Sequence, residues 1–247
     1  ERNIHIVITA QTNFGNGYPE RNIQTGGFSY KYDKCDMHSN PEAIAAQETY
    51  LRDLVKHTNP YTGLAYKDDP SIVGFEINNE PCHSGTKEEV KAYINRMLKS
   101  MSKAGNRKPV FYNVSHNGYV AEAYYETTVQ GTTYQWYPIG LVSGQTQQGN
   151  FLPYVDRYDI PFAGKVKEFN KKARMIYEFD PADIMYSYMY PAMVRTFRTA
   201  GFQWITQFAY DPIDLAFANT EYQTHFLNLA YTPNKAISMK IAAEAAR

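Results

Sequence analysis

The sequence predicts an α/β protein built from parallel strand–helix units. Segments typical of strands alternate with segments typical of amphipathic helices along the 247 residues. The apolar run from Ile72 to Phe75 is typical of a strand that a parallel sheet buries on both faces. No internal repeat, low-complexity tract or Gly/Ser linker divides the chain. We therefore expect six such units in succession.

Each predicted strand is a short run rich in β-branched or aromatic residues. Pro81 ends the second of them, because proline cannot donate a hydrogen bond to a neighbouring strand. The six strands are predicted at 4–9, 71–78, 109–115, 131–137, 173–179 and 202–210.

The predicted helices are marked by residues at their ends. Asn40 is a typical N-cap and Pro41 a typical first helical residue. Thr86 and Glu89 have the spacing of a capping box, and Gly105 fits the end of the same helix. Further helices are predicted at 150–171, at 191–200 before Gly201, and in the tail to residue 247.

The composition excludes several classes of protein. The 25 basic and 25 acidic residues cancel, so the chain lacks the basic patch of a nucleic-acid-binding protein. No apolar run reaches the roughly 20 residues that a membrane span needs. The glycines at 15 and 17 do not form the GxGxxG fingerprint of a nucleotide-binding sheet. The 22 tyrosines suit either packing or a carbohydrate site, and composition does not choose between them.

Two predicted strands end on a glutamate. The stretch "GFEINNEP" carries Glu80 at the carboxyl end of the second strand, and "ARMIYEFDPAD" carries Glu178 at the carboxyl end of the fifth. Because parallel strands present their carboxyl ends at one edge, both carboxylates are expected on the same face of the sheet. Glycoside hydrolysis uses such a pair, in which one acid protonates the leaving oxygen and the other attacks carbon or activates water.

The stretch "GFEINNEP" resembles the acid/base strand of clan A glycoside hydrolases, the retaining β-glycosidases of families such as 2, 5 and 42. Their E-x-x-N-E-P pattern is reproduced by Glu76, Asn79, Glu80 and Pro81. Glu178, 98 positions after Glu80 (178 − 80), matches their strand-seven glutamate. The resemblance implies an α/β fold of the (β/α) TIM-type barrel class. It also implies that residues 1–247 are a catalytic barrel domain that covers strands three to eight of eight.

On this resemblance the chain lacks the first two β/α units and is part of a longer protein with other domains. The resemblance implies that Glu80 is the general acid/base and Glu178 the nucleophile, with no cofactor and no metal. Asn79 is expected to hydrogen-bond the 2-hydroxyl of a carbohydrate substrate. Tyr137, ahead of Tyr134, matches a strand-six tyrosine that touches the nucleophile. A secreted, periplasmic or cell-surface protein is favoured.

Other sugar contacts are expected at strand ends on the same edge. Many clan members carry a tryptophan at the end of strand eight, where this chain has Gln207 and Tyr210 instead. Asn13, His116 and Trp136 are the remaining substrate-binding candidates. For each of them the alternative is a loop residue whose polar groups are satisfied by the backbone, or, for Trp136, a residue that faces the helices.

Several residues have a structural interpretation. Glu76 lies four residues before Glu80, and Arg174 is a candidate ion-pair partner for it. The stretch "DKCDMH" matches no structural zinc pattern, so a polar loop is the alternative to a metal site. Cys35 and Cys82 form a disulfide only if their geometry allows it.

The substrate stays open among β-galactosides, β-mannosides and β-glucosides. The alternatives to a retaining hydrolase are a glycan-binding barrel without catalysis and a metal-dependent barrel hydrolase. The sequence predicts no nucleic-acid partner and no membrane span.

Overall fold

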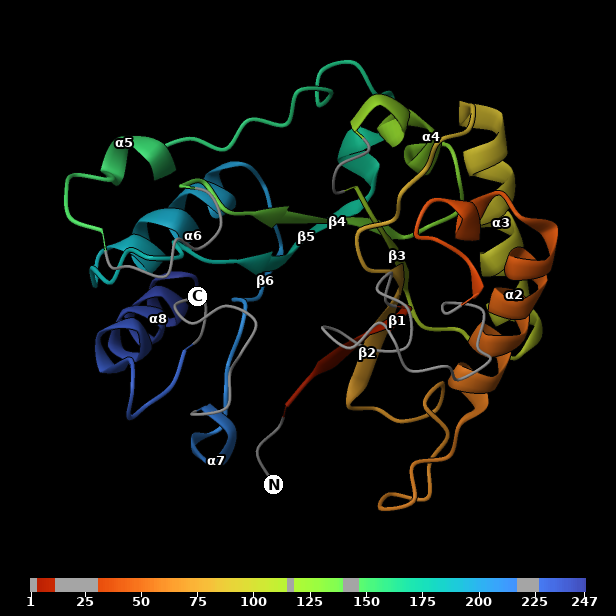
Figure 1. Cartoon of the computed structure of the whole chain (residues 1–247), viewed down its shortest axis with the longest axis horizontal. Helices are drawn as coiled ribbons and strands as arrows, with labels where there is room; N and C mark the ends of the chain where they lie inside the picture. The colour runs from red at the N-terminus through yellow and green to blue at the C-terminus, as the bar shows by residue number, and fades with distance from the viewer. Residues whose placement is uncertain (1–3, 12–30, 115–117, 140–146, 217–226) are drawn as a thin grey trace. The chain divides into compact units, whose positions relative to one another are not determined.

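The structure is a computed structural model that describes residues 4–11, 31–114, 118–139, 147–216 and 227–247 (Figure 1). The chain forms two compact units. Unit 1 consists of Glu1–Thr133 and Pro161–Ala173, and unit 2 of Tyr134–Ile160 and Arg174–Arg247. The strand β4 passes from the first unit into the second.

Unit 1 holds parallel strands whose order in the sheet follows the chain. Thr9 pairs with Glu76 across the first two strands, and Asn113 pairs with Thr133 across the last two. The strands are β1 Ile6–Gln11, β2 Ile72–Asn78, β3 Val110–Asn113 and the start of β4 Gly131–Trp136. The predicted parallel arrangement is confirmed for these strands.

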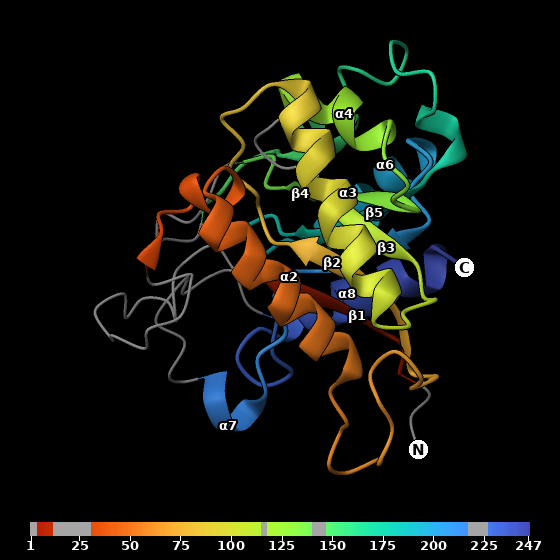
Figure 2. The ribbon, with the colours of Figure 1, turned by 90° about the vertical axis from the view of Figure 1, so that its right-hand side faces the viewer.

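Two long helices, α2 (Pro41–Lys56) and α3 (Lys87–Lys103), lie side by side in unit 1 (Figures 1 and 2). The predicted caps are confirmed. The Asn40 side chain accepts hydrogen bonds from two backbone N–H groups of the first turn of α2. Thr86 and Glu89 form the reciprocal capping box of α3. The shorter elements are η1 Asp36–His38, η2 Gly118–Val120, α4 Ala121–Tyr125 and η3 Phe169–Lys171.

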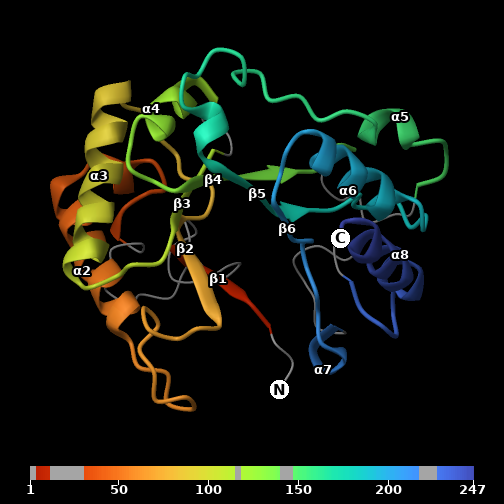
Figure 3. The same cartoon turned by 180° about the vertical axis from the view of Figure 1, so that it is seen from behind.

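Unit 2 continues the parallel pattern. The end of β4 is followed in the sheet by β5 (Ala173–Phe179) and β6 (Trp204–Ile205). The helices α6 (Met189–Thr199) and α8 (Pro233–Ala245) lie side by side (Figure 3). Two further helices, α5 Leu152–Val155 and α7 Ile213–Ala216, are single turns.

The prediction of one helix over 150–171 is wrong. Only α5 and η3 are helical there, and turns connect them. Pro161 explains the break, because proline has no N–H to donate and disfavours a helical conformation at the residue before it.

The strand predicted over 202–210 is shorter than expected as a regular element. Its pairing with β5 nevertheless continues beyond β6, because Thr206 N donates to Ile176 O and Phe208 N donates to Phe179 O. Among the described helices, none has the length and apolar character needed to cross a membrane.

Gly131 at the start of β4 is expected to be intolerant of a side chain. A Cβ there would meet the Phe111 ring and come within 2.7 Å of the Ala173 carbonyl oxygen. We expect Gly131→Ala to lower the free energy of unfolding in urea by about 1–3 kcal/mol, as overpacking typically does. Gly164→Ala is the matched control, because a Cβ there meets no described atom within 4 Å. Equal stability of the two variants would contradict the expectation.

Candidate active site

Glu80 lies two residues beyond the end of β2, in unit 1. Asn79 extends the pairing with β1, since its N–H donates to Gln11 O at 2.9 Å. The chain then turns at Glu80, whose φ of 44° is in the left-handed region that residues with a side chain rarely adopt. The Glu80 side chain is 18% exposed, and its Oε2 lies 3.8 Å from Lys34 Nζ. The turn thus presents a partly buried glutamate beside a cation.

A disulfide lies directly after this turn. Cys82, two residues beyond Glu80, is bonded to Cys35, with the two Cα atoms 4.7 Å apart. The alternative that the sequence left open is therefore decided in favour of a bond. The metal interpretation of "DKCDMH" gains no support, because no group of three or more His, Cys, Asp or Glu side chains within the described ranges could hold a metal ion.

Glu76, four residues before Glu80, is completely buried in β2. Thr9 Oγ1 donates to its Oε2 at 2.6 Å, and Thr133 Oγ1 donates to its Oε1. Burial raises the pKa of the Glu76 carboxyl to about 7, while the hydrogen bonds from the hydroxyls oppose the rise. Hydroxyl groups on β1 and β4 thus bind the Glu76 carboxyl within unit 1, whereas Arg174 belongs to unit 2, and the expected ion pair with it stays a prediction.

A cavity of about 450 Å³ also lies in unit 1. His38 and His83 line it, with their ring centroids 4.5 Å apart. Burial lowers the pKa of His38 to about 4 and that of His83 to about 2, so both imidazoles are neutral at pH 7. His83 Nε2 is hydrogen-bonded to the Tyr112 hydroxyl at 2.6 Å. The pair is thus an uncharged part of the cavity wall in unit 1 at neutral pH.

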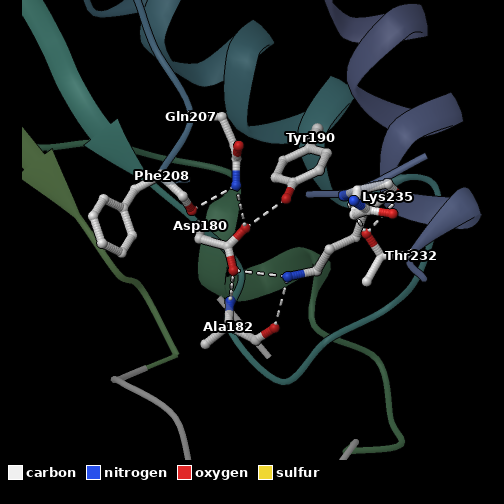
Figure 4. Close-up of polar contacts among 8 residues, drawn as sticks. Asp180, Ala182, Tyr190, Gln207, Phe208, Thr232 and Lys235 are labelled. Atoms are coloured by element: carbon white, nitrogen blue, oxygen red, sulfur yellow. Dashed lines mark hydrogen bonds and ion pairs between the residues drawn. The ribbon is translucent and has the colours of Figure 1, made fainter. Parts of the chain in front are cut away.

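Glu178 is the penultimate residue of β5, in unit 2, and is half-buried. The chain beyond it is fixed by Asp180, which is completely buried (Figure 4). Asp180 Oδ2 accepts from Lys235 Nζ at 2.8 Å and from Ala182 N at 2.9 Å. Burial raises the pKa of the Asp180 carboxyl, and the Lys235 ammonium opposes that rise. An ion pair with both partners buried therefore lies two residues beyond Glu178.

Two more groups complete the set around Asp180. Its Oδ1 accepts from the Tyr190 hydroxyl at 2.5 Å and from Gln207 Nε2 at 3.3 Å (Figure 4). Sequence reasoning missed Asp180, Tyr190 and Lys235. The Asp-Pro step after a strand-end glutamate was a usable signal for Asp180. Lys235 carries no such signal, because a lysine in the first turn of a helix is ordinarily solvated.

The aromatic candidates of unit 2 lie in different surroundings. The Tyr137 ring meets the Phe208 ring edge-on, with centroids 6.3 Å apart. Trp136 packs edge-on against Tyr158 and Phe197, with centroids at 5.0 and 5.2 Å. Since Phe197 belongs to α6, Trp136 faces a helix.

The other candidates are placed as follows. Gln207 is bound to Asp180, and Tyr210 is 57% exposed. Asn13 and His116 lie outside the described residues. Gln207 and Tyr210 both belong to unit 2. The role of all four residues as sugar contacts stays a prediction.

Comparison with known proteins finds similarity to polysaccharide-degrading enzymes. A 64-residue segment, 25% of this chain, is 31% identical to mannan endo-1,4-beta-mannosidase 3 of Arabidopsis thaliana and spans 16% of that protein. The fold is similar to an endo-1,4-beta-mannanase from Rhizomucor miehei, with a TM-score of 0.66 and 16% identity over 98% of this chain and 72% of that one. No protein-family model matches the sequence.

Two further solved structures agree. An endo-beta-1,4-mannanase from Thermotoga petrophila has a TM-score of 0.67 and 13% identity, over 98% of this chain and 58% of that one. A beta-glucanase from Saccharophagus degradans has a TM-score of 0.58 and 12% identity, over 99% of this chain and 68% of that one. The chain therefore has the α/β fold of these mannanase and glucanase structures.

The pKa of Glu76 predicts a pH-dependent stability. Folding raises that pKa from 4.5 to about 7, so the native state holds the proton more tightly and loses stability as the pH rises between these values. Glu76→Gln lacks this titration. Between pH 4.5 and pH 8, the free energy of unfolding of the variant should therefore rise relative to that of the wild type by on the order of 3 kcal/mol.

Urea unfolding at both pH values measures this gain. The control is Glu88→Gln, which changes a glutamate whose side chain is 81% exposed and should follow the wild type. A Glu76→Gln variant with the wild-type pH dependence would show that Glu76 does not titrate in this range.

The ion pair between Asp180 and Lys235 predicts a large loss of stability on truncation. Lys235→Met leaves the Asp180 charge buried without its cation, which should lower the free energy of unfolding by about 3–5 kcal/mol at pH 7. Arg195→Met is the control, because it breaks an exposed pair with Asp156 and should change little. Denaturant unfolding compares the two, and similar losses would argue against the structural importance of the buried pair.

Proposed function

We propose that this chain is the catalytic part of a retaining β-glycoside hydrolase. The observation that carries the proposal is the E-x-x-N-E-P pattern at the end of β2 together with Glu178 at the end of β5. The chain has a fold whose solved examples include mannanases and a glucanase, which supports that assignment. Paired carboxylates at strand ends are the groups that double displacement at a sugar needs.

The proposed mechanism assigns one step to each carboxyl. Glu80 protonates the departing glycosidic oxygen while Glu178 attacks the anomeric carbon and forms a glycosyl-enzyme. Glu80 then removes a proton from water, which attacks the same carbon and releases Glu178. Asn79 would hold the 2-hydroxyl of the sugar, and Tyr137 would contact the nucleophile. No cofactor enters either step.

We propose a β-1,4-linked mannan as the substrate. The relatives support this choice, because the Arabidopsis protein and two of the solved structures carry mannan-degrading activity in their names. The beta-glucanase keeps a β-glucan as the alternative. Asn13, His116, Gln207 and Tyr210 are the further sugar contacts that we propose. Trp136 is not among them, because it packs against Phe197 of α6.

We also propose that residues 1–247 correspond to strands three to eight of an eight-stranded barrel domain. The support is the place of the two glutamates, on the second and fifth of the six described strands. In clan A enzymes these positions correspond to strands four and seven. Further parts of a longer chain would then supply the remaining strands.

Azide rescue tests the two roles separately. In the protein that contains this chain, Glu178→Ala should abolish hydrolysis, and azide should restore turnover of an activated aryl β-mannoside with an α-glycosyl azide as product. Glu80→Ala should lose roughly 10²–10⁴-fold in kcat/KM on unactivated substrates. With azide it should give the β-glycosyl azide, because azide then intercepts the glycosyl-enzyme.

Product configuration is read by NMR, and Glu88→Ala serves as the surface control. A fully active Glu178→Ala variant would end the proposal. Identical azide products from both variants would overturn the assignment of the two roles.

A further inference from the structure

The turn that carries Glu80 is in a backbone conformation that must be held from outside. A φ of 44° places Glu80 in the left-handed region, which costs roughly 1–2 kcal/mol for a residue with a side chain. Such conformations persist where the surroundings determine them. The turn therefore depends on the groups fixed on either side of it.

On the near side, the hydrogen bond from Asn79 N to Gln11 O ties the chain to β1. On the far side, Cys82 is covalently bonded to Cys35. Pro81 stands between Glu80 and Cys82 and restricts the backbone further. Only two residues thus separate the hydrogen bond at Asn79 from the disulfide at Cys82, and Glu80 is one of them.

The other end of the disulfide is itself well anchored. Cys35 directly precedes η1, whose Met37 and His38 are buried. Gln47 on α2 donates to Met37 O at 2.6 Å, and His38 Nε2 lies 3.3 Å from Asn78 Nδ2 at the end of β2. The disulfide therefore fixes the Glu80 turn to a rigid segment.

The same anchor also positions a charge. Lys34 is the neighbour of Cys35, and its Nζ lies 3.8 Å from Glu80 Oε2. The two side chains are only 29% and 18% exposed, so water screens their attraction incompletely. One covalent bond thus sets both the backbone of Glu80 and the cation next to its carboxylate.

We infer that the Cys35–Cys82 disulfide, together with Lys34, is a positioning device for the general acid/base Glu80. This inference rests on the proposed function. Cys35, Cys82 and Lys34 act through Glu80 and are positioning residues. A general acid must lie within hydrogen-bond reach of the leaving oxygen, so a loosened turn should weaken proton donation before it weakens any other step.

The dependence on the leaving group distinguishes this role from a general loss of structure. A 2,4-dinitrophenyl β-mannobioside releases its dinitrophenolate without protonation. A phenyl β-mannobioside needs the general acid to protonate its leaving oxygen. The test compares kcat/KM for both substrates in the oxidised protein, in the protein reduced with dithiothreitol, and in the variants Cys35→Ser/Cys82→Ser and Lys34→Met. Dithiothreitol supplies the two electrons and two protons that convert the disulfide to two thiols and is itself oxidised to a cyclic disulfide.

We expect reduction or the double serine variant to lower kcat/KM on the phenyl glycoside roughly 10- to 100-fold, with little change on the dinitrophenyl glycoside. Lys34→Met should cause a smaller loss of the same kind. Lys91→Met is its control, because Lys91 pairs with Glu88 and Glu126 on the surface. Circular dichroism and urea unfolding show whether each protein remains folded.

Each other outcome overturns the inference. Free thiols in denatured, unreduced protein would show that the bond does not form. Equal losses on both glycosides, or no loss on either, would show that the bond does not position the acid. An oxidised wild type that hydrolyses neither these mannobiosides nor the corresponding aryl β-cellobiosides would instead refute the proposed function, and the inference with it.

Discussion

Each unit has a buried carboxylate next to its strand-end glutamate, and each must neutralise that carboxylate to fold. Glu76 lies four residues before Glu80, and Asp180 lies two residues after Glu178. Removing an ionised carboxylate from water costs several kcal/mol unless partners replace the lost hydration. The partners that each acid recruits therefore fix the strand end on which it lies.

The two units meet this constraint differently. Glu76 is bound by neutral donors, among them the hydroxyls of Thr9 and Thr133, and its pKa rises to about 7. Asp180 has the ammonium of Lys235 and the hydroxyl of Tyr190, so an ion pair replaces its hydration. The first arrangement links β2 to β1 and, across β3, to β4, because the two hydroxyls come from those strands. The second ties the loop after β5 to two helices, α6 and α8.

The extent to which the sequence predicts this structure follows from the range of the interactions involved. Asn40 and Thr86 bond to backbone groups two or three residues away, so their sequence patterns alone predict both helix starts. The E-x-x-N-E-P pattern placed Glu80 at a strand end for the same reason, since Pro81 stops the ladder locally.

The threonine partners of Glu76 are 67 and 57 residues away in the chain, and sequence reasoning named Arg174 but neither threonine. Threonine is common in strands and carries no charge. The sequence therefore does not mark these two threonines as partners of a buried carboxylate. The disulfide is a similar case, in which two cysteines 47 residues apart are related only by the fold. Lys235 is 55 residues from Asp180 and lies in a helix that sequence patterns alone do not mark as buried.

These long-range contacts have a shared consequence for chemistry. A general acid needs a fixed position and a nucleophile needs a fixed direction, and neither is provided by the strand-end residues themselves. The left-handed backbone at Glu80 is held by the Cys35–Cys82 disulfide. Beyond Glu178, Asp180 binds the chain to α6 and α8. A change at Cys35 should therefore affect Glu80 while leaving the Asp180 contacts intact, because the disulfide and the ion pair lie in separate units. The contacts described around the two proposed catalytic groups thus belong to different units of the chain.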